Sequence, residues 1–290
     1  MTRLSTVLLL TARLGSSFAS ASRIHKPPAA PNKIRTPLAA VAPAAAVVKS
    51  ATSAGLACAA VGFVSAHASV SYGYGLAIAW HARAALQSAT TPVAVRVLLA
   101  YGLKVTAYQA LRDREKHYRD AVLPLFRALE KDTKCPFTRT THKIPLVAGV
   151  ACLLALYAAP IRFLAQAPRP RVTVFAGAVA AAALTVQTVA DAQKFAAKRR
   201  APDRPCTTGL WRVSRHVNYA ADVVLHGAVA VAAALNAPSA ATALLAITAP
   251  LMMVNIVLSA TESLDGRQRL AYRDDAFEAY VAATPRLFFT

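Results

Sequence analysis

The fold is decided by residues 172–194, VTVFAGAVAAAALTVQTVADAQK. From 172 to 186 this stretch carries only small or apolar side chains and two threonines, and its first charge comes at Asp191. A helix of about 20 mainly apolar residues is long enough to cross a bilayer. The stretch therefore predicts a membrane-spanning helix over 172–190 whose far end is polar.

Other apolar stretches of similar length occur along the chain. Of its 290 residues, 56% are hydrophobic and only 16% are charged, whereas soluble domains carry about 25% charged residues. The apolar residues form blocks of membrane length rather than amphipathic stripes. We predict an all-α fold, a polytopic membrane helix bundle with six or seven transmembrane helices. The further predicted spans are 93–111, 144–164, 217–235 and 239–260, with two shorter ones within 51–90 that meet at a turn over 69–75.

The first 50 residues have the composition of a targeting leader. Seven Lys and Arg residues stand among Ser, Thr, Ala and Pro, and the first acidic residue is Asp113. Such leaders are typical of mitochondrial and plastid transit peptides. A secretory signal with its apolar core at 7–10 is the alternative, but Arg13 interrupts that core. We therefore expect a multi-pass protein of the mitochondrial inner membrane or of a plastid membrane. The expected organisation is a leader over 1–50, an N-terminal transmembrane region over 51–165 and a C-terminal membrane domain over 166–290.

Basic charge dominates the chain, with a formal net charge of +20. The segments 112–143 and 191–216 are strongly basic, whereas the turns at 165–171 and 236–238 carry two arginines between them. This asymmetry follows the positive-inside tendency and places both basic segments on the cytosolic, matrix or stromal face. Basic residues in loops beside a membrane indicate membrane lipid as a partner and disfavour nucleic acid.

The cysteines give no sign of a metal site. Cys58, Cys135, Cys152 and Cys206 have no CxxC spacing and no neighbouring His/Cys pattern. Cys58 and Cys152 fall inside apolar runs, where a free thiol packs as a small hydrophobic group. We predict that the protein binds no metal.

Residues 209–222, GLWRVSRHVNYAAD, form the densest polar block of the chain. The block offers an indole, hydroxyl, guanidinium, imidazole, amide, phenol and carboxylate directly before an apolar run, a set that suits a cofactor bearing phosphate or adenosine. Arg215 can hold a phosphate bidentately, and Asn218 and Asp222 lie one helical turn apart on one face. A carboxylate in a membrane helix indicates a functional site. The alternative is that Arg215 and Asp222 form a structural ion pair, while Trp211 and Tyr219 anchor the chain at the interface.

The polar end of the span 172–190 is placed to complete the same site. Gln187 and Asp191 are four residues apart and share a helix face, and Lys194 and Lys198 follow at one-turn intervals with geometry for a phosphate. The alternative is a helix end whose basic residues contact lipid headgroups. The tail after 260 predicts a short amphipathic helix and an apolar hook, which is either a lid over the basic face or a plain surface helix.

These motifs occur in an order and spacing that resemble a known family. The chain carries Asp191-Ala-Gln-Lys194, Gly209-Leu-Trp211, Ser214-Arg-His216, Asn218-Tyr219, Ser259 and Phe277-Glu-Ala-Tyr280 with Pro285. Together they resemble the C-terminal domain of the steroid 5-alpha-reductase superfamily, most of all its uncharacterised branch of reductase-like membrane proteins. The resemblance covers about 170–290, and a fainter one occurs at Tyr72-Gly-Tyr-Gly-Leu76.

The resemblance implies a bundle of about seven helices that holds NADPH at its basic face and transfers hydride to an activated C=C bond. By position, Asp191, Lys198, Asn218 and Asp222 correspond to cofactor-contacting residues, with Arg215 and His216 beside them. Arg267 or Arg269 corresponds more loosely to a residue for the 2′-phosphate. The full set that we expect to contact the cofactor is Gln187, Asp191, Lys194, Lys198, Trp211, Ser214, Arg215, His216, Asn218, Tyr219, Asp222 and Arg269.

The chain departs from the family pattern at several positions. Val217 stands where the family has Pro, Ala220-Ala221 where it has Phe-Gly, and Asp222 where it has Glu. Characterised reductases of this superfamily use a carboxylic acid with a tyrosine from the N-terminal half, and here no carboxylate precedes Asp113. The sequence therefore assigns no catalytic residue. The tyrosines open as proton donors are Tyr72, Tyr74, Tyr101 and Tyr108.

Three functions remain open at this stage. The first is an NADPH-dependent ene-reductase acting on a lipid, isoprenoid or sterol-like substrate. The second is a membrane methyltransferase that uses S-adenosylmethionine, since such enzymes carry a similar Arg-His-Pro-X-Tyr segment. The third is a non-catalytic structural subunit of a larger organellar membrane complex, which the departures favour. The segments 191–194 and 209–211 favour the reductase.

Overall fold

The computed structural model describes residues 44–60, 72–86, 92–116, 118–122, 140–272 and 274–288. Residues Ala51–Thr290 form one compact unit, and residues Met1–Ser50 form another. Apart from residues 44–50, which begin a helix, the predicted leader lies outside the described residues.

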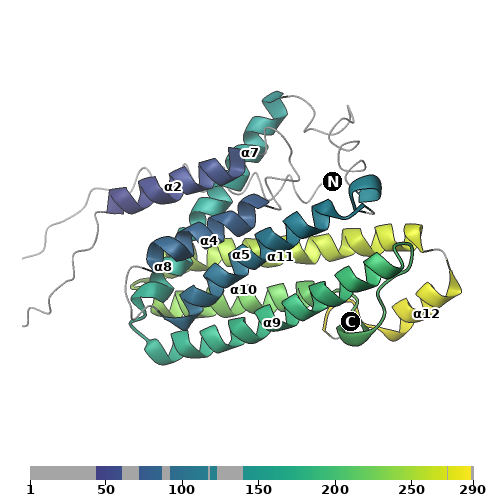
Figure 1. Cartoon of the computed structure of the whole chain (residues 1–290). Coiled ribbons are helices and arrows are strands. Elements are labelled where there is room, and N and C mark those ends of the chain that lie inside the picture. Colours follow the sequence, from purple (N-terminus) through teal and green to yellow (C-terminus); the bar gives the residue numbers. More distant parts are fainter. Residues whose placement is uncertain are drawn as a thin grey trace, which may run out of the picture. The chain divides into compact units, whose positions relative to one another are not determined.

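The compact unit is built from helices (Figure 1). No strand occurs in the described ranges, so the predicted all-α class is confirmed. Short π-helical and 3-10 turns, η3 (Tyr118–Val122) and η4 (Gly209–Arg212), stand between the longer elements. The α-helices are α2 (Ala44–Ala60), α4 (Tyr74–Ala85), α5 (Val93–Arg114), α7 (Thr140–Leu156), α8 (Ala158–Gln166), α9 (Pro170–Arg200), α10 (Val217–Asn236), α11 (Ala240–Ala271) and α12 (Asp275–Ala283).

Within the described residues, four helical stretches are long and apolar enough to cross a membrane: Val147–Gln166, Pro170–Arg200, Val217–Asn236 and Ala240–Arg269. They contain most of four predicted spans, and the fold is that of a helical membrane bundle. The predicted span 93–111 forms one helix, α5, which carries Arg96 and Lys104 and is not among these four. The total of six or seven spans therefore stays a prediction.

The chain reverses sharply between α8 and α9. Ala167 has a φ of 37°, in the left-handed region, and Pro170 occupies the first turn of α9, where its missing N–H leaves no hydrogen bond unmade. Asn236 fixes this corner from the other side, because its Oδ1 accepts from Arg169 N at 2.9 Å and its Nδ2 donates to Thr173 Oγ1 at 3.0 Å. The end of α10 is thus tied to the start of α9, and the two helices run antiparallel.

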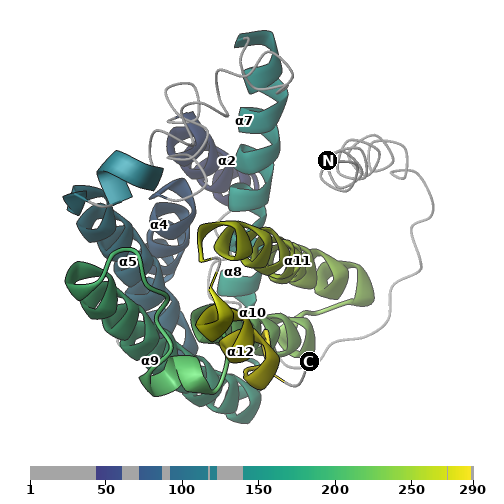
Figure 2. The same ribbon diagram turned by 90° about the vertical axis from the view of Figure 1, so that its right-hand side faces the viewer.

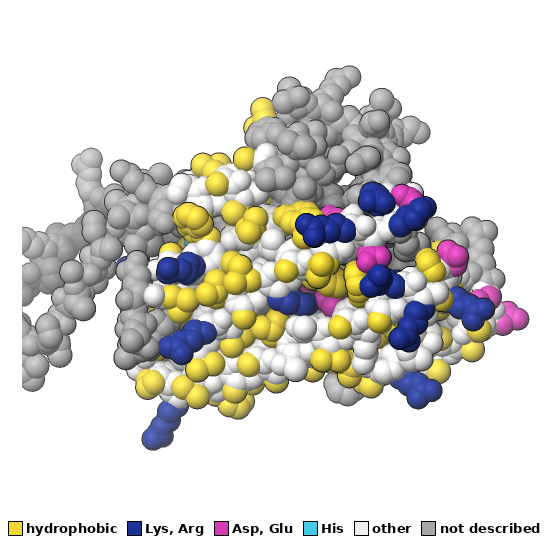
Figure 3. Space-filling view, viewed as in Figure 1, with side chains coloured by type: hydrophobic (Ala, Val, Ile, Leu, Met, Phe, Trp, Pro, Cys, Tyr) yellow, Lys and Arg dark blue, Asp and Glu magenta, His cyan; other side chains and the backbone are white. Residues whose placement is uncertain are grey.

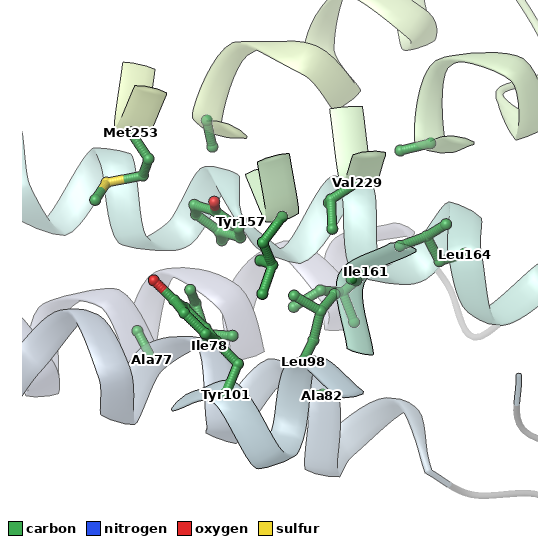
Figure 4. Close-up of a cluster of buried hydrophobic side chains, with 14 of the residues drawn as sticks. Ala77, Ile78, Ala82, Leu98, Tyr101, Tyr157, Ile161, Leu164, Val229 and Met253 are labelled. Carbon is green, nitrogen blue, oxygen red and sulfur yellow. The ribbon is translucent and has the colours of Figure 1, made fainter. Parts of the chain in front are cut away.

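Helix α10 lies between α9 and α11 (Figure 2), and α4 packs on α5. Close approach of α4 and α5 depends on glycine, since a Cβ on Gly102 would lie 2.4 Å from Gly75 O. Figure 4 shows the centre of the core, where Leu98 and Tyr101 of α5 face Tyr157 and Ile161 near α8. All four side chains are at most 1% exposed.

The outer surface of the bundle is apolar. Phe175 is 73% exposed, Leu244 64% and Val231 61%, values that suit contact with lipid rather than with water. On the face drawn in Figure 3, hydrophobic side chains cover much of the flank, and most charged side chains gather toward the end of the bundle near α12. That end carries the site described next.

Candidate functional site

A buried layer of polar side chains crosses from α5 to α10. The Lys104 ammonium of α5 donates to Gln187 Oε1 at 2.9 Å and forms an ion pair with Asp191, both on α9. Asn218 of α10 donates through Nδ2 to the other oxygen of Asp191 at 3.0 Å. Asp191 is only 5% exposed, so its charge needs these partners.

The layer continues inward to Asp222 of α10. Gln187 Nε2 donates to Asp222 Oδ1, and the Tyr101 hydroxyl of α5 donates to the same oxygen at 2.9 Å. Gln187 therefore bridges Lys104 and Asp222 with the two ends of its amide. We call Lys104, Gln187, Asp191, Asn218 and Asp222 the polar layer.

Below the polar layer, a histidine is enclosed by three tyrosines. His226 of α10 is 0% exposed. The hydroxyl of Tyr74 lies 2.5 Å and that of Tyr101 3.3 Å from Nε2, and the hydroxyl of Tyr157 lies 2.6 Å from Nδ1. A neutral imidazole has one donor and one acceptor nitrogen, so hydroxyls on both sides satisfy it in either tautomer. Tyr101 belongs to both groups and links His226 to Asp222.

Toward the end of α5 and the start of α10, several buried polar atoms of Gln109, Arg112 and Asn218 make no hydrogen bond, and we call this region the mouth of the polar layer. Asn218 Oδ1, Gln109 Oε1 and the Nε and Nη2 of Arg112 are buried without a hydrogen bond, and Arg112 Nη2 forms an ion pair with Asp113 Oδ1 at 3.6 Å. The Arg112 guanidinium lies 4.1 Å from the centroid of the Tyr118 ring and interacts electrostatically with Lys194 and Tyr219. An unmet buried hydrogen bond costs about 1–3 kcal/mol. The mouth therefore presents two guanidinium nitrogens and two amide oxygens suited to a polar guest.

The first half of the block 209–216 fastens onto the end of α9. Trp211 is 2% exposed and its Nε1 donates to Ala190 O at 3.0 Å, while Lys194 lies 4.9 Å from the centroid of its ring. Gly209 has a φ of +64°, and a Cβ there would lie 2.6 Å from Gln193 Oε1. That oxygen accepts from Leu210 N at 2.9 Å. Glycine is required at this turn for both reasons.

The second half of the block holds the C-terminal segment. Ser214 Oγ and His216 N donate to Arg286 O at 3.0 and 3.1 Å, and Arg215 N donates to Pro285 O at 3.0 Å. The Arg215 guanidinium donates to the carbonyl of Val281 at 2.8 Å and also to that of Thr284. We call Ser214, Arg215 and His216 the tail clasp.

Asp265, near the end of α11, contacts the side chains of Arg215 and His216 in the tail clasp. Its carboxylate lies 2.6 Å from His216 Nε2, 3.2 Å from Arg215 Nη2 and 3.0 Å from Arg286 Nε. Burial lowers the pKa of His216, and the hydrogen bond and charge of Asp265 oppose that shift. The imidazole therefore favours its neutral form here, in which Nε2–H donates to Asp265. The alternative of an ion pair between Arg215 and Asp222 is wrong, because Arg215 pairs with Asp265.

Two further residues that we predicted to contact the cofactor, Lys198 and Arg269, make hydrogen bonds within the protein. Lys198 donates to Pro202 O at 2.8 Å, to Arg204 O at 2.7 Å and to the Tyr272 hydroxyl. Arg269 donates to Glu278 of α12 at 2.8 Å, and both side chains are about half exposed. These contacts tie α12 and the loop after α9 to the bundle.

The predicted site residues thus fall into three places. Gln187, Asp191, Asn218 and Asp222 meet in the polar layer, and Lys194 and Tyr219 lie at its mouth. Contact of any of them with a cofactor stays a prediction. The remaining ones, which hold the tail, the loops or α12, are Lys198, Trp211, Ser214, Arg215, His216 and Arg269.

Sequence reasoning missed four residues of this region: Lys104, Arg112, Tyr157 and His226. Lys104 and His226 stand inside the predicted spans 93–111 and 217–235. An ionisable group within a membrane helix is by itself a reason to expect a site, so that signal was present for both. Nothing local marks Arg112 or Tyr157, since both depend on which helices pack together.

A family model for proteins of unknown function, DUF1295, matches residues 69–284. The chain belongs to the DUF1295 family. This family is related to steroid 5-alpha-reductase-like membrane proteins. The DUF1295 region includes the polar layer, the three tyrosines around His226 and all of α12. No curated protein and no solved structure matches the chain.

Proposed function

We propose that this DUF1295 protein is an integral membrane reductase that uses NADPH to reduce a C=C bond of a lipid, isoprenoid or sterol-like substrate. One observation carries the proposal: a buried polar layer with unmet hydrogen-bonding atoms at its mouth, set among apolar helices. Ionisable groups in apolar surroundings cost free energy, and their presence in membrane helices therefore indicates a functional site. The predicted motif residues Gln187, Asp191, Asn218 and Asp222 supply most of this layer.

The residues at the mouth fit the chemistry of a dinucleotide. Arg112 and Lys194 offer cations for phosphates, and the unpartnered Oδ1 of Asn218 offers an acceptor for an amide or amine. The carboxylate of Asp191 has lone pairs left for ribose hydroxyls, because each carboxylate accepts up to about four hydrogen bonds. NADPH, when bound, supplies the hydride.

Reduction of an activated C=C bond also needs a proton, and we assign its donation to Tyr101. Its hydroxyl donates to Asp222 at 2.9 Å and lies 3.3 Å from His226 Nε2. When hydride adds to the β-carbon of the activated C=C bond, the Tyr101 O–H bond would break and its proton would pass to the α-carbon, which completes the saturated C–C bond. Hydrogen bonds from His226 and from the Tyr74 hydroxyl, 3.0 Å away, stabilise the phenolate until water reprotonates it.

The other tyrosines are less suited to this role. Tyr72 donates to Asp113 at 2.6 Å, and Asp113 pairs with Arg112 at the mouth rather than with Asp222. Tyr74 has no carboxylate partner and lies one hydroxyl farther from Asp222 than Tyr101 does. The lack of any carboxylate before Asp113 is no obstacle, since Asp222 of the C-terminal half supplies one.

A second candidate function is supported by the tail clasp. Ser214, Arg215 and His216 donate hydrogen bonds to carbonyl groups of the C-terminal segment. A protein that needs these residues only to fix its own tail can serve as a structural subunit of an organellar membrane complex. Under this reading, the resemblance to reductases reflects descent alone.

Cofactor binding separates the candidates. We expect the full chain, purified in detergent, to change NADPH fluorescence saturably, and Asn218→Ala and Asp222→Ala to abolish that change. Lys116→Gln is the matched control, because Lys116 makes an exposed pair with Asp120 at 2.7 Å and its loss should leave affinity unchanged. Binding of S-adenosylmethionine alone would instead identify a methyltransferase. Binding of neither compound by a protein with native helicity would favour the structural subunit.

A further inference from the structure

A separate groove lies between α9 and α10, lined by other residues than the polar layer. Its volume is about 630 Å³, within the range of ligand sites. The walls are formed by Phe175, Val179, Val224, Val231 and Leu235, and Arg171 is the one charged residue of its lining.

The floor of the groove is open because its side chains are small. Ala176, Gly227, Ala228 and Ala232 line it, and a Cβ built on Gly227 would meet no atom within 4 Å. Phe175 and Val231 are mostly exposed at its rim. Since α9 and α10 are both apolar enough to cross a membrane, the groove opens toward lipid chains.

The length of the groove matches one leaflet of a bilayer. The corner formed by Arg169, Thr173 and Asn236 places Arg171 where α9 begins and α10 ends. From Arg171 the groove extends along α9 to Val179, a rise of ~12 Å at about 1.5 Å per residue. Half of the hydrocarbon core is ~15 Å thick. The groove therefore runs from the headgroup level most of the way to the bilayer centre.

Arg171 supplies a charge at the headgroup end. Its side chain is exposed, and no carboxylate of the described ranges forms an ion pair with it. A guanidinium at this depth binds phosphate well. We propose that the groove binds one acyl chain of an anionic phospholipid whose phosphate contacts Arg171. This site does not depend on the proposed reductase activity.

A transmembrane helix of a second copy is the other occupant to consider, since small residues favour helix packing. Such a helix would cover Arg171 and needs its own acceptor for the guanidinium, because an unpaired buried charge is strongly unfavourable. The turn after α10, residues 237–239, and the first turn of α11 carry no acidic residue. A second copy therefore offers no anion at this level from its corresponding corner.

The test is lipid binding measured by native mass spectrometry of the full chain in detergent, titrated with phosphatidylglycerol or phosphatidylcholine. We expect one saturable phosphatidylglycerol per chain, bound more tightly than phosphatidylcholine. Arg171→Gln should weaken phosphatidylglycerol binding about five-fold and remove the preference. Gly227→Leu should abolish the site, because its Cβ would meet no protein atom within 4 Å and the rest of the side chain would extend into the groove.

Gly266→Leu is the matched control. Gly266 is also helical, and a Cβ there likewise meets nothing within 4 Å, yet it lies outside the groove. The Gly266→Leu variant should bind phosphatidylglycerol with the affinity of the unchanged protein. Equal affinity for the two lipids, or unchanged binding by Gly227→Leu, would overturn the proposal. A dimer that Gly227→Leu dissociates, without any lipid-selective loss, would assign the groove to a second copy instead.

Discussion

Loss of the Lys104 ammonium should destabilise the bundle more than loss of any surface charge. In the Lys104→Met variant, the buried Asp191 carboxyl loses its ion-pair partner and keeps Asn218 as its remaining hydrogen-bond partner. Lys104 and Asp191 side chains are 17% and 6% exposed. Removal of one member of a buried pair costs about 3–5 kcal/mol. We expect ~3 kcal/mol, the lower end of that range, because the hydrogen bond from Asn218 persists.

The pairing itself is isolated by a double-variant cycle. Asp191→Asn removes the carboxylate that pairs with Lys104, so Lys104→Met in that background leaves no carboxylate without its partner. The loss of stability in the double variant Lys104→Met/Asp191→Asn should be smaller than the sum of the two single losses by at least ~1 kcal/mol. Lys116→Met is the control, since Lys116 pairs with Asp120 at 2.7 Å on an exposed surface and should change stability by less than about 0.5 kcal/mol.

Thermal unfolding in detergent, followed by a thiol-reactive fluorophore, measures these differences. Cys206 is 8% exposed and becomes reactive when the end of α9 opens. A loss of ~3 kcal/mol should lower the unfolding midpoint by roughly 6–12 °C. The ion pair does not hold α5 to α9 if Lys104→Met and Lys116→Met unfold at the same midpoint. The same follows if the stability losses of the two single variants add up to that of the double variant.

Other consequences concern the core, the chemistry and pH. Gly102→Ala should lower stability by about 1–3 kcal/mol, because its Cβ would lie 2.4 Å from Gly75 O; an unchanged midpoint would contradict the packing of α4 on α5. Tyr101→Phe should keep NADPH affinity while slowing reduction of an enone substrate by about 10²–10⁴-fold, measured as NADPH consumption; equal rates would exclude Tyr101 as donor. Since burial lowers the pKa of His216 below its ordinary value of 6.5, stability is fully present above that pH and declines as the pH falls further. Unfolding midpoints between pH 8 and 5 should show this decline, and a His216→Gln variant should lack it.

The fold class could be predicted because hydropathy reports contact with lipid directly. The predicted span 172–190 corresponds to α9, Pro170–Arg200, and 239–260 corresponds to α11, Ala240–Ala271. In both cases the helix continues past the apolar part into charged residues. Hydropathy indicates where a helix meets hydrocarbon, whereas the helix ends where the backbone loses its hydrogen-bond partners. The predicted spans therefore end too early on their polar side, at 190 rather than Arg200 and at 260 rather than Ala271.

The polar layer could be predicted in part from spacing. Gln187 and Asp191 were expected to share a helix face, and both contact Lys104. The contacts that complete the layer join residues far apart in sequence, such as Lys104 with Asp191 or Tyr101 with Asp222. A single sequence gives the periodicity within a helix but not the pairing between helices. For the same reason, the use of Arg215 to hold the tail could not be foreseen.

The contrast between the tail clasp and the polar layer bears on function. Residues of the clasp make hydrogen bonds to carbonyls and a carboxylate, and Arg215 Nε is the one side-chain atom of the three residues left buried without a hydrogen bond. At the mouth of the polar layer, Asn218 Oδ1, Gln109 Oε1 and Arg112 Nε instead make no hydrogen bond. Each such atom costs about 1–3 kcal/mol, and apolar or smaller residues there would avoid that penalty. A purely structural layer gains nothing from keeping them, whereas a site that binds a polar guest requires unused donors and acceptors where the guest enters.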